Sequence, residues 1–277
     1  MARKNRNEMS FIEHLEDLRW HIIRTLVVIV ACSVFFLIRP DIIFDKVILG
    51  PKDLNFPTYQ VMCALGERLS LNGLCIDELN YDLFYLNISS PFFLYLKIAI
   101  MGGAIFAFPY ILWEIWRFVR PGLHLHEKRN LGGLVFVATL LFYIGCFFGY
   151  FLLAPFSINF LANFELSDQV KNQFTFDSYL GILTGMVLWT GVIFEIPMIA
   201  YFLARMGLLT NKFMMQQRKF AFVASLVLAA VITPSGDAFS LFLVATPLWA
   251  LYEVSIIVVR RVEKRMAKEE GSDASPA

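Results

Sequence analysis

Two carboxylates at the edges of apolar segments, Asp17 and Glu127, are the first candidates for binding chemistry in this chain. A carboxylate binds a guanidinium group through two parallel hydrogen bonds, a geometry that lysine cannot reproduce. The pair therefore predicts an acidic site for a ligand that carries arginine. Each residue also has a structural interpretation. Asp17 lies in an amphipathic stretch that fits a solvated helix face, and Glu127 fits the first turn of a helix.

A third carboxylate, Glu195, lies inside an apolar segment. It precedes Arg205 by ten residues, which in a helix corresponds to about 15 Å and places it near the middle of a membrane. A charge there costs at least about 2.5 kcal/mol, so we expect Glu195 to be neutral, paired or exposed to water. A structural hydrogen bond between helices remains the alternative. Glu253 lies nearer the end of its segment and fits a structural role, with its side chain extended to the membrane surface.

The remaining residues with reactive side chains give weaker indications. Cys63 and Cys75 lie in the same long segment between apolar runs, where a disulfide bond and two free thiols are both compatible with the sequence. Cys32 and Cys146 lie within apolar runs and are expected to be packing residues. The four histidines show no arrangement typical of a metal site. No nucleotide-binding or hydrolase motif occurs, so we expect no metal, no cofactor and no enzymatic activity.

Long apolar segments position these groups. About 20 helical residues span a hydrocarbon core of roughly 30 Å, and the chain is 58% hydrophobic with only 17% charged residues. We predict an all-α integral membrane protein with six transmembrane helices, the last two of them short, in a single membrane domain over residues 1–277. The predicted helices occupy residues 20–40, 90–118, 131–158, 177–204, 216–233 and 239–259, with an outer cap loop at 41–88 and a polar cytoplasmic tail at 262–277.

The distribution of basic residues predicts how these helices are oriented. Most of the 24 Lys and Arg fall in residues 1–24, 117–129, 205–219 and 260–268. Basic segments stay on the cytoplasmic side of a membrane, so both termini are expected in the cytoplasm. The first apolar run is too long for a cleavable signal peptide and is expected to remain as a helix. The net charge of +1 gives no reason to expect nucleic acid as a partner.

Five short motifs occur in order between residues 12 and 260. They are HLEDLR at 14–19, SPFF at 90–93 followed by Lys97, WRFVRPGLHLHEKR at 116–129, FEIP at 194–197 and TPSGD at 233–237. Together they resemble the TatC family, the six-helix core of the twin-arginine protein translocase. The resemblance implies a receptor in a bacterial inner (cytoplasmic) membrane that binds the twin-arginine signal peptides of folded cargo at its cytoplasmic face. It also implies partners of the TatA and TatB types with one membrane helix each, contact with membrane lipids, self-association in the complex, and transport driven by the proton-motive force.

The resemblance also assigns roles to individual residues. Asp17 and Glu127 match the acidic positions that recognise the arginine pair. Phe118 matches the aromatic residue of the same loop, and Arg19 matches the arginine of the N-terminal motif. The family commonly has Glu where this chain has Asp17, and Glu16 stands beside it, so the sequence leaves open which of the two carboxylates faces the peptide.

For Glu195, the resemblance implies a polar group that faces a concave groove and receives the membrane helix of a partner. A small-solute secondary transporter is the alternative function. Such a protein would be expected to show paired broken helices, a polar site at mid-membrane and an internal repeat. Glu195 stands alone at mid-membrane and the sequence shows no repeat, so the translocase receptor is the function that we predict.

Overall fold

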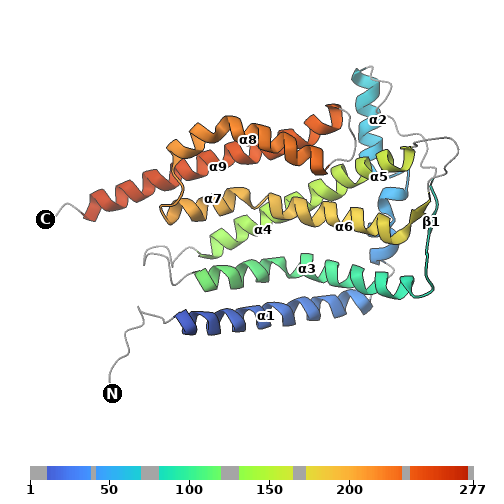
Figure 1. Cartoon of the computed structure of the whole chain (residues 1–277), viewed down its shortest axis with the longest axis horizontal. Coiled ribbons are helices and arrows are strands. Elements are labelled where there is room, and N and C mark those ends of the chain that lie inside the picture. Colours follow the sequence, from blue (N-terminus) through green and yellow to red (C-terminus); the bar gives the residue numbers. More distant parts are fainter. Residues whose placement is uncertain are drawn as a thin grey trace. The chain divides into compact units, whose positions relative to one another are not determined.

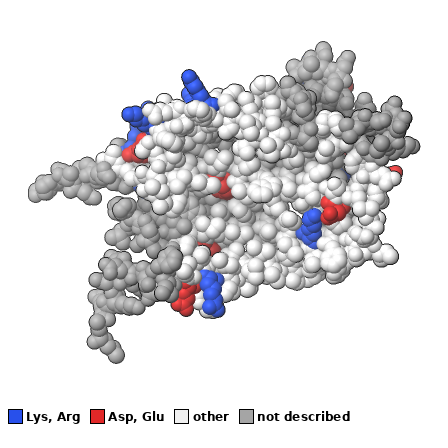
Figure 2. All heavy atoms as spheres, in the orientation of Figure 1, with Lys and Arg blue, Asp and Glu red and all other residues white. Residues whose placement is uncertain are grey.

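Helices make up nearly all of the described chain in the computed structural model (Figure 1). The structure describes residues 11–38, 42–69, 81–119, 131–164, 173–232 and 238–273. Within these ranges, six helical spans are long and apolar enough to cross a membrane: Leu15–Ile38, Ser90–Phe118, Gly132–Asn163, Phe176–Arg205, Asn211–Ile232 and Leu241–Ala267. Uncharged residues cover most of the described surface on the face shown in Figure 2, as expected for helices that contact lipid. The predicted all-α membrane fold is confirmed.

The elements follow one another from α1 to α9, with two very short strands. In chain order they are α1 (Phe11–Ile38), η1 (Ile42–Ile48), η2 (Gly50–Lys52), α2 (Pro57–Leu69), β1 (Leu83–Phe84), α3 (Ser90–Val119), α4 (Leu131–Phe148), η5 (Gly149–Leu153), α5 (Ala154–Asn163), β2 (Phe174–Thr175), α6 (Phe176–Ile193), α7 (Ile196–Arg205), α8 (Asn211–Ile232) and α9 (Ala238–Asp273). The strands β1 and β2 pair in parallel. With two residues each, they are too short to show the alternation by which a strand is predicted.

The chain divides into two compact units, one of residues 1–43 and 91–139 and the other of residues 44–90 and 140–277. In the first unit, α1 and α3 run antiparallel, because their contacts pair in reverse order along the chain. The Tyr95 hydroxyl donates to the carbonyl of Leu37 at the end of α1. Nearer the middle of α1, a Cβ on Gly103 would lie 2.7 Å from the backbone nitrogen of Ser33. The two backbones therefore touch where the sequence provides a glycine.

In the second unit, the backbones of α4 and α6 also approach each other closely at glycines. A Cβ added to Gly145 would lie 2.6 Å from the carbonyl oxygen of Thr190, and one added to Gly149 would lie 2.7 Å from the carbonyl oxygen of Met186. Gly145 and Gly149 form a GxxxG motif, which allows close approach of helices in a membrane. Lipid tails are as apolar as side chains there, so van der Waals contact drives much of the association.

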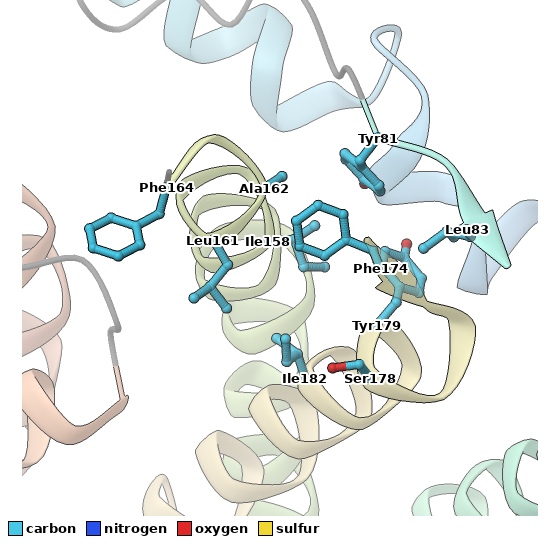
Figure 3. A pocket seen from close by; sticks show the side chains of 10 residues that line it. All are labelled: Tyr81, Leu83, Ile158, Leu161, Ala162, Phe164, Phe174, Ser178, Tyr179 and Ile182. Atoms are coloured by element: carbon cyan, nitrogen blue, oxygen red, sulfur yellow. The ribbon is translucent and has the colours of Figure 1, made fainter. Parts of the chain in front are cut away.

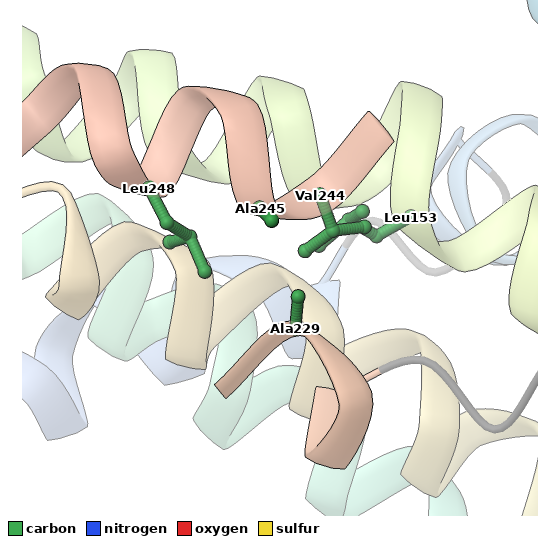
Figure 4. Packing of buried hydrophobic residues seen from close by; sticks show 5 residues of the cluster. All are labelled: Leu153, Ala229, Val244, Ala245 and Leu248. Atoms are coloured by element: carbon green, nitrogen blue, oxygen red, sulfur yellow. The ribbon is translucent and has the colours of Figure 1, made fainter. Parts of the chain in front are cut away.

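The helix α9 packs against both α7 and α8. A buried cluster joins the end of α8 and the first turns of α9 to η5, and it consists of Leu153, Ala229, Val244, Ala245 and Leu248 (Figure 4). Small alanines facing larger branched side chains let these elements interdigitate. The cluster therefore fixes the position of the last two spans within the second unit.

Polar contacts also hold α8 and α9 together. The Glu263 carboxylate accepts a hydrogen bond of 2.8 Å from the backbone N–H of Asn211, and so caps the first turn of α8. Arg218 forms an ion pair with Glu253. Glu253 has the structural role that the sequence indicated, and it achieves this by pairing with an arginine of the neighbouring helix.

Three helix boundaries differ from those predicted, each for a local reason. The third span contains the π-helical turn η5 directly before Pro155, whose ring cannot donate the helical hydrogen bond. The fourth span breaks between α6 and α7, where Pro197 occupies the first turn of α7. The last helix is not short: α9 has 36 residues and continues through the predicted polar tail to Asp273. Glu, Lys, Arg and Ala in that tail are strong helix formers.

Within the second unit, tyrosine hydroxyls bind the first part of the predicted cap loop to η5 and α6. Tyr150 of η5 donates to the carbonyl of Val47, and Tyr179 of α6 donates to the carbonyl of Ile48, each at 2.7 Å. The segment contains the short helices η1, η2 and α2. The bond from Tyr179 is buried, so it satisfies a carbonyl that would otherwise lack a donor.

We predict that Gly149→Ala lowers the free energy of unfolding by about 1–3 kcal/mol, because the new methyl group collides with the backbone of α6. Gly181→Ala in α6 is the matched control, since a Cβ there meets nothing within 4 Å. That change should be neutral or stabilising, as alanine favours the helix. Thermal unfolding of the purified protein in detergent measures both. Equal destabilisation by the two substitutions would contradict the proposed backbone contact.

Candidate functional site

The predicted peptide-binding residues that the structure describes lie at one end of the α1–α3 pair. Glu16, Asp17 and Arg19 are exposed on the first half of α1. Phe118 is half-buried near the end of α3. Because α1 and α3 are antiparallel, the beginning of one lies beside the end of the other. Glu127 lies outside the described residues, so its predicted role stays a prediction.

Phe118 of α3 contacts α1 through the ring of His21. The two rings meet edge to face, with their centroids 5.8 Å apart and an interplanar angle of 70°. His21 follows Asp17 by one helical turn, so both side chains lie on the same face of α1. Asp17 and Phe118 are therefore at the same end of this unit, which is the arrangement that a shared ligand requires.

Glu114 is a buried carboxylate directly next to this end, and the sequence analysis missed it. Only 2% of its surface is exposed. One carboxylate oxygen, Oε2, pairs with Nδ1 of His21, and the other, Oε1, accepts a hydrogen bond of 2.8 Å from the Tyr110 hydroxyl. Both oxygens are thus satisfied, as burial of a carboxylate among apolar helices demands. An acidic residue inside the apolar run 90–118 was the indication that could have revealed it.

The pair formed by Glu114 and His21 links α3 to the face of α1 that carries Asp17. A buried carboxylate with a single arrangement of partners fixes the rotation and the register of the two helices. Tyr110 and Glu114 lie on one face of α3, four residues apart. These contacts place Phe118, one turn further along α3, beside His21. Glu114 is therefore a positioning residue for the candidate binding end.

The second candidate site, Glu195, lies at the break between α6 and α7. It occupies the N-cap position of α7, but its side chain makes no capping hydrogen bond. The residue is 7% exposed, and its Oε1 is buried without a hydrogen-bond partner. By contrast, Glu253 and Glu263 in α9 both have partners. An orphaned carboxylate oxygen among apolar helices is costly, so it indicates that the site serves something other than stability.

The cysteines differ in their bonding state. Cys63 in α2 is disulfide-bonded. Cys75 lies outside the described residues, and its pairing with Cys63 stays a prediction. Cys32 and Cys146 are free thiols. Within the described ranges, no group of three or more His, Cys, Asp or Glu residues could hold a metal ion.

Six apolar spans with carboxylates buried among them define a multi-pass membrane protein. A family model for the Sec-independent protein translocase protein (TatC) matches residues 13–247, and the chain belongs to this family. It is 34% identical to TatC of Blattabacterium over 265 residues, covering 95% of this chain and 99% of that protein. It is 30% identical to TatCy of Bacillus subtilis over 273 residues, covering 99% and 97%.

Solved structures agree with the family assignment. A crystal structure of the twin-arginine translocase receptor TatC matches with a TM-score of 0.61 and 27% identity, covering 91% of this chain and 100% of the other. A second, in the detergent DDM, matches with a TM-score of 0.67 and 28% identity, covering 89% and 99%. The protein is thus a translocase subunit of the bacterial inner membrane. Membership of this family favours neither an enzyme nor the small-solute transporter.

We predict that His21→Leu lowers the free energy of unfolding by about 1–3 kcal/mol, because it leaves one oxygen of the buried Glu114 carboxylate without a partner. The matched control is Ile22→Ala on the same helical turn, a side chain that is 57% exposed and should change stability by less than about 0.5 kcal/mol. Thermal unfolding in detergent compares the two. In the double variant with Glu114→Leu, much of the loss should be recovered. A purely additive result would refute the coupling.

Proposed function

We propose that the protein is the signal-peptide receptor of a twin-arginine translocase, with the peptide bound at the end of the α1–α3 pair that carries Asp17 and Phe118. The observation that supports this is the ring contact of 5.8 Å between His21 and Phe118, one helical turn from Asp17. It brings a carboxylate and an aromatic residue to the same end. We place this end, and both chain termini, on the cytoplasmic side of the membrane.

The proposed binding chemistry uses both features of a twin-arginine peptide. Asp17 and Glu127 bind the two guanidinium groups through paired hydrogen bonds, and the apolar part of the peptide packs on Phe118. Asp17 is favoured over Glu16 because it lies one turn before His21, whereas Glu16 is rotated by about 100° around the helix. Arg19, exposed on the same helix, adds a positive charge close to the carboxylates of Glu16 and Asp17.

We predict that Asp17→Asn weakens binding of a twin-arginine peptide by about 10- to 100-fold, because a hydrogen bond to a charged partner is lost. The matched control is Glu16→Gln, which removes a neighbouring exposed carboxylate and should leave binding within about twofold. Glu127→Arg should abolish binding. Titration of a fluorescent signal peptide against protein in nanodiscs measures all three. Equal effects at positions 16 and 17 would contradict the proposed face of α1.

Photocrosslinking provides the direct test of the site. A photoreactive amino acid at position 17, 118 or 127 should label a peptide that carries Arg-Arg and should fail to label one that carries Lys-Lys. A probe at position 82, in the segment predicted to lie on the opposite side of the membrane, is the negative control. Equal labelling by both peptides would mean that this end is only a solvated surface.

The same proposal assigns Glu195 to the docking of a partner's membrane helix, of the TatA or TatB type. Its unpartnered oxygen lies in a helix break and is ready to accept a hydrogen bond from a polar residue of that helix. We further propose that the chain acts as a single membrane domain over residues 1–277, that it self-associates in the complex, and that the proton-motive force drives transport.

We predict that Glu195→Leu raises the free energy of unfolding by about 1 kcal/mol while it abolishes protein export, because it removes an unsatisfied polar group together with the docking contact. The matched control is Glu263→Leu, which deletes the cap of α8 and should lower stability by about 0.5–2 kcal/mol. Thermal unfolding in detergent and an export assay in cells measure the two effects. Normal export and unchanged crosslinks to a single-span partner by Glu195→Leu would refute the docking role.

A further inference from the structure

A pocket of about 320 Å³ opens between the end of α5 and the start of α6, in the second unit (Figure 3). Ile158 and Leu161 of α5 and Ile182 of α6 contribute to its apolar wall, and Tyr81 and Phe174 line it on the side of the strands. The two spans that form it end near Asn163 and begin at Phe176. The pocket therefore lies at the boundary between the hydrocarbon core and the polar headgroups of the membrane, where tyrosine is enriched.

Three residues with a hydroxyl group line this pocket, namely Tyr81, Ser178 and Tyr179, and Tyr81 differs from the other tyrosine. Only 6% of Tyr81 is exposed, and its hydroxyl is buried without a hydrogen-bond partner. Its neighbours differ: Tyr59 and Tyr179, equally buried, donate to the carbonyls of Pro51 and Ile48, each at 2.7 Å. Burial raises the pKa of Tyr81 to about 12, so this hydroxyl keeps its proton at neutral pH. An orphaned donor that lines a pocket indicates a ligand with an acceptor.

A cation lies beside the same ring. The ammonium group of Lys52 is 5.6 Å from the centroid of the Tyr81 ring. The neighbouring carboxylate of Asp53 accepts hydrogen bonds from Asn55 at 2.9 and 3.1 Å and is thereby engaged locally. The pocket thus combines an apolar lining, a buried hydroxyl without a partner and a positive charge over the ring that carries this hydroxyl.

We propose that this pocket binds one acyl chain of a phospholipid. The Tyr81 hydroxyl donates to the ester carbonyl of the lipid, and Lys52 lies beside its phosphate group. The volume is at the lower end of the range for small-molecule sites. It is too small for a partner's helix, which has a diameter of about 10 Å and needs an extended groove. The site is separate from the proposed peptide and partner sites and does not rest on them.

The test uses the full-length protein in nanodiscs of phosphatidylcholine with a small fraction of phosphatidylglycerol that carries a photoactivatable acyl chain. Adducts mapped by mass spectrometry should concentrate on residues 158–162 and 178–182. Ala162→Trp, which fills the pocket, should reduce these adducts at least tenfold. Val231→Trp, at a side chain of α8 that is 78% exposed, should leave them unchanged. Labelling spread evenly over all lipid-facing helices, or no effect of Ala162→Trp, would overturn the proposal.

Two gentler variants test the polar contacts and do not depend on the folding of Ala162→Trp. Tyr81→Phe removes only the hydroxyl and should reduce pocket adducts about fivefold. Lys52→Gln should remove the preference for phosphatidylglycerol over a diacylglycerol probe with the same chain. Equal labelling of the wild-type protein by both probes, or no effect of Tyr81→Phe, would refute recognition of a phospholipid. Crosslinks from these positions to a protein partner in place of lipid would refute it as well.

Discussion

Contact between helix backbones at glycine is the interaction on which the rest of the described structure depends. Inside a membrane, apolar side chains gain little by leaving lipid, so helices associate where their surfaces fit closely. Gly103 provides this fit between α1 and α3, and Gly145 and Gly149 provide it between α4 and α6. Close approach at these points sets the register in which the more distant polar side chains find their partners.

The two buried glutamates show the opposite outcomes of placing a carboxylate among apolar helices. Glu114 has a partner on each oxygen, and its bond to His21 links α3 to α1. Glu195 keeps an oxygen without a partner at a point where the helix is already interrupted. The proposed docking role gives this unpartnered oxygen a hydrogen-bond donor on a partner's membrane helix. The first glutamate therefore stabilises the packing of two helices, and the second has the role in assembly that we propose for it.

The sequence predicted the features that depend on local composition. Six spans follow from runs of apolar residues. It failed where the deciding contact joins distant positions: His21 and Glu114 are 93 residues apart, and neither has a spacing that reveals the other. The end of α9 was missed because a charged segment can be either a solvated tail or a helix, and hydropathy does not distinguish the two.

The sequence also placed Asp17, Phe118 and Glu195 in roles that depend on their surroundings. The structure adds the neighbour that relates Asp17 to Phe118, namely His21. No pattern in α1 could identify this histidine, because the same spacing fits an interfacial helix whose side chains only contact water. Long-range pairing is a property of the packed helices, and it emerges only when their register is known.

The contacts between α1 and α3 have a mechanical consequence. Tyr95 holds the carbonyl of Leu37 near one end of the pair, and Glu114 holds His21 toward the other. A helix of 28 residues is about 42 Å long, so two fastenings far apart prevent the helices from sliding or rolling independently. The two helices form one rigid pair. We therefore expect a displacement of α1 at one surface of the membrane to tilt both helices together.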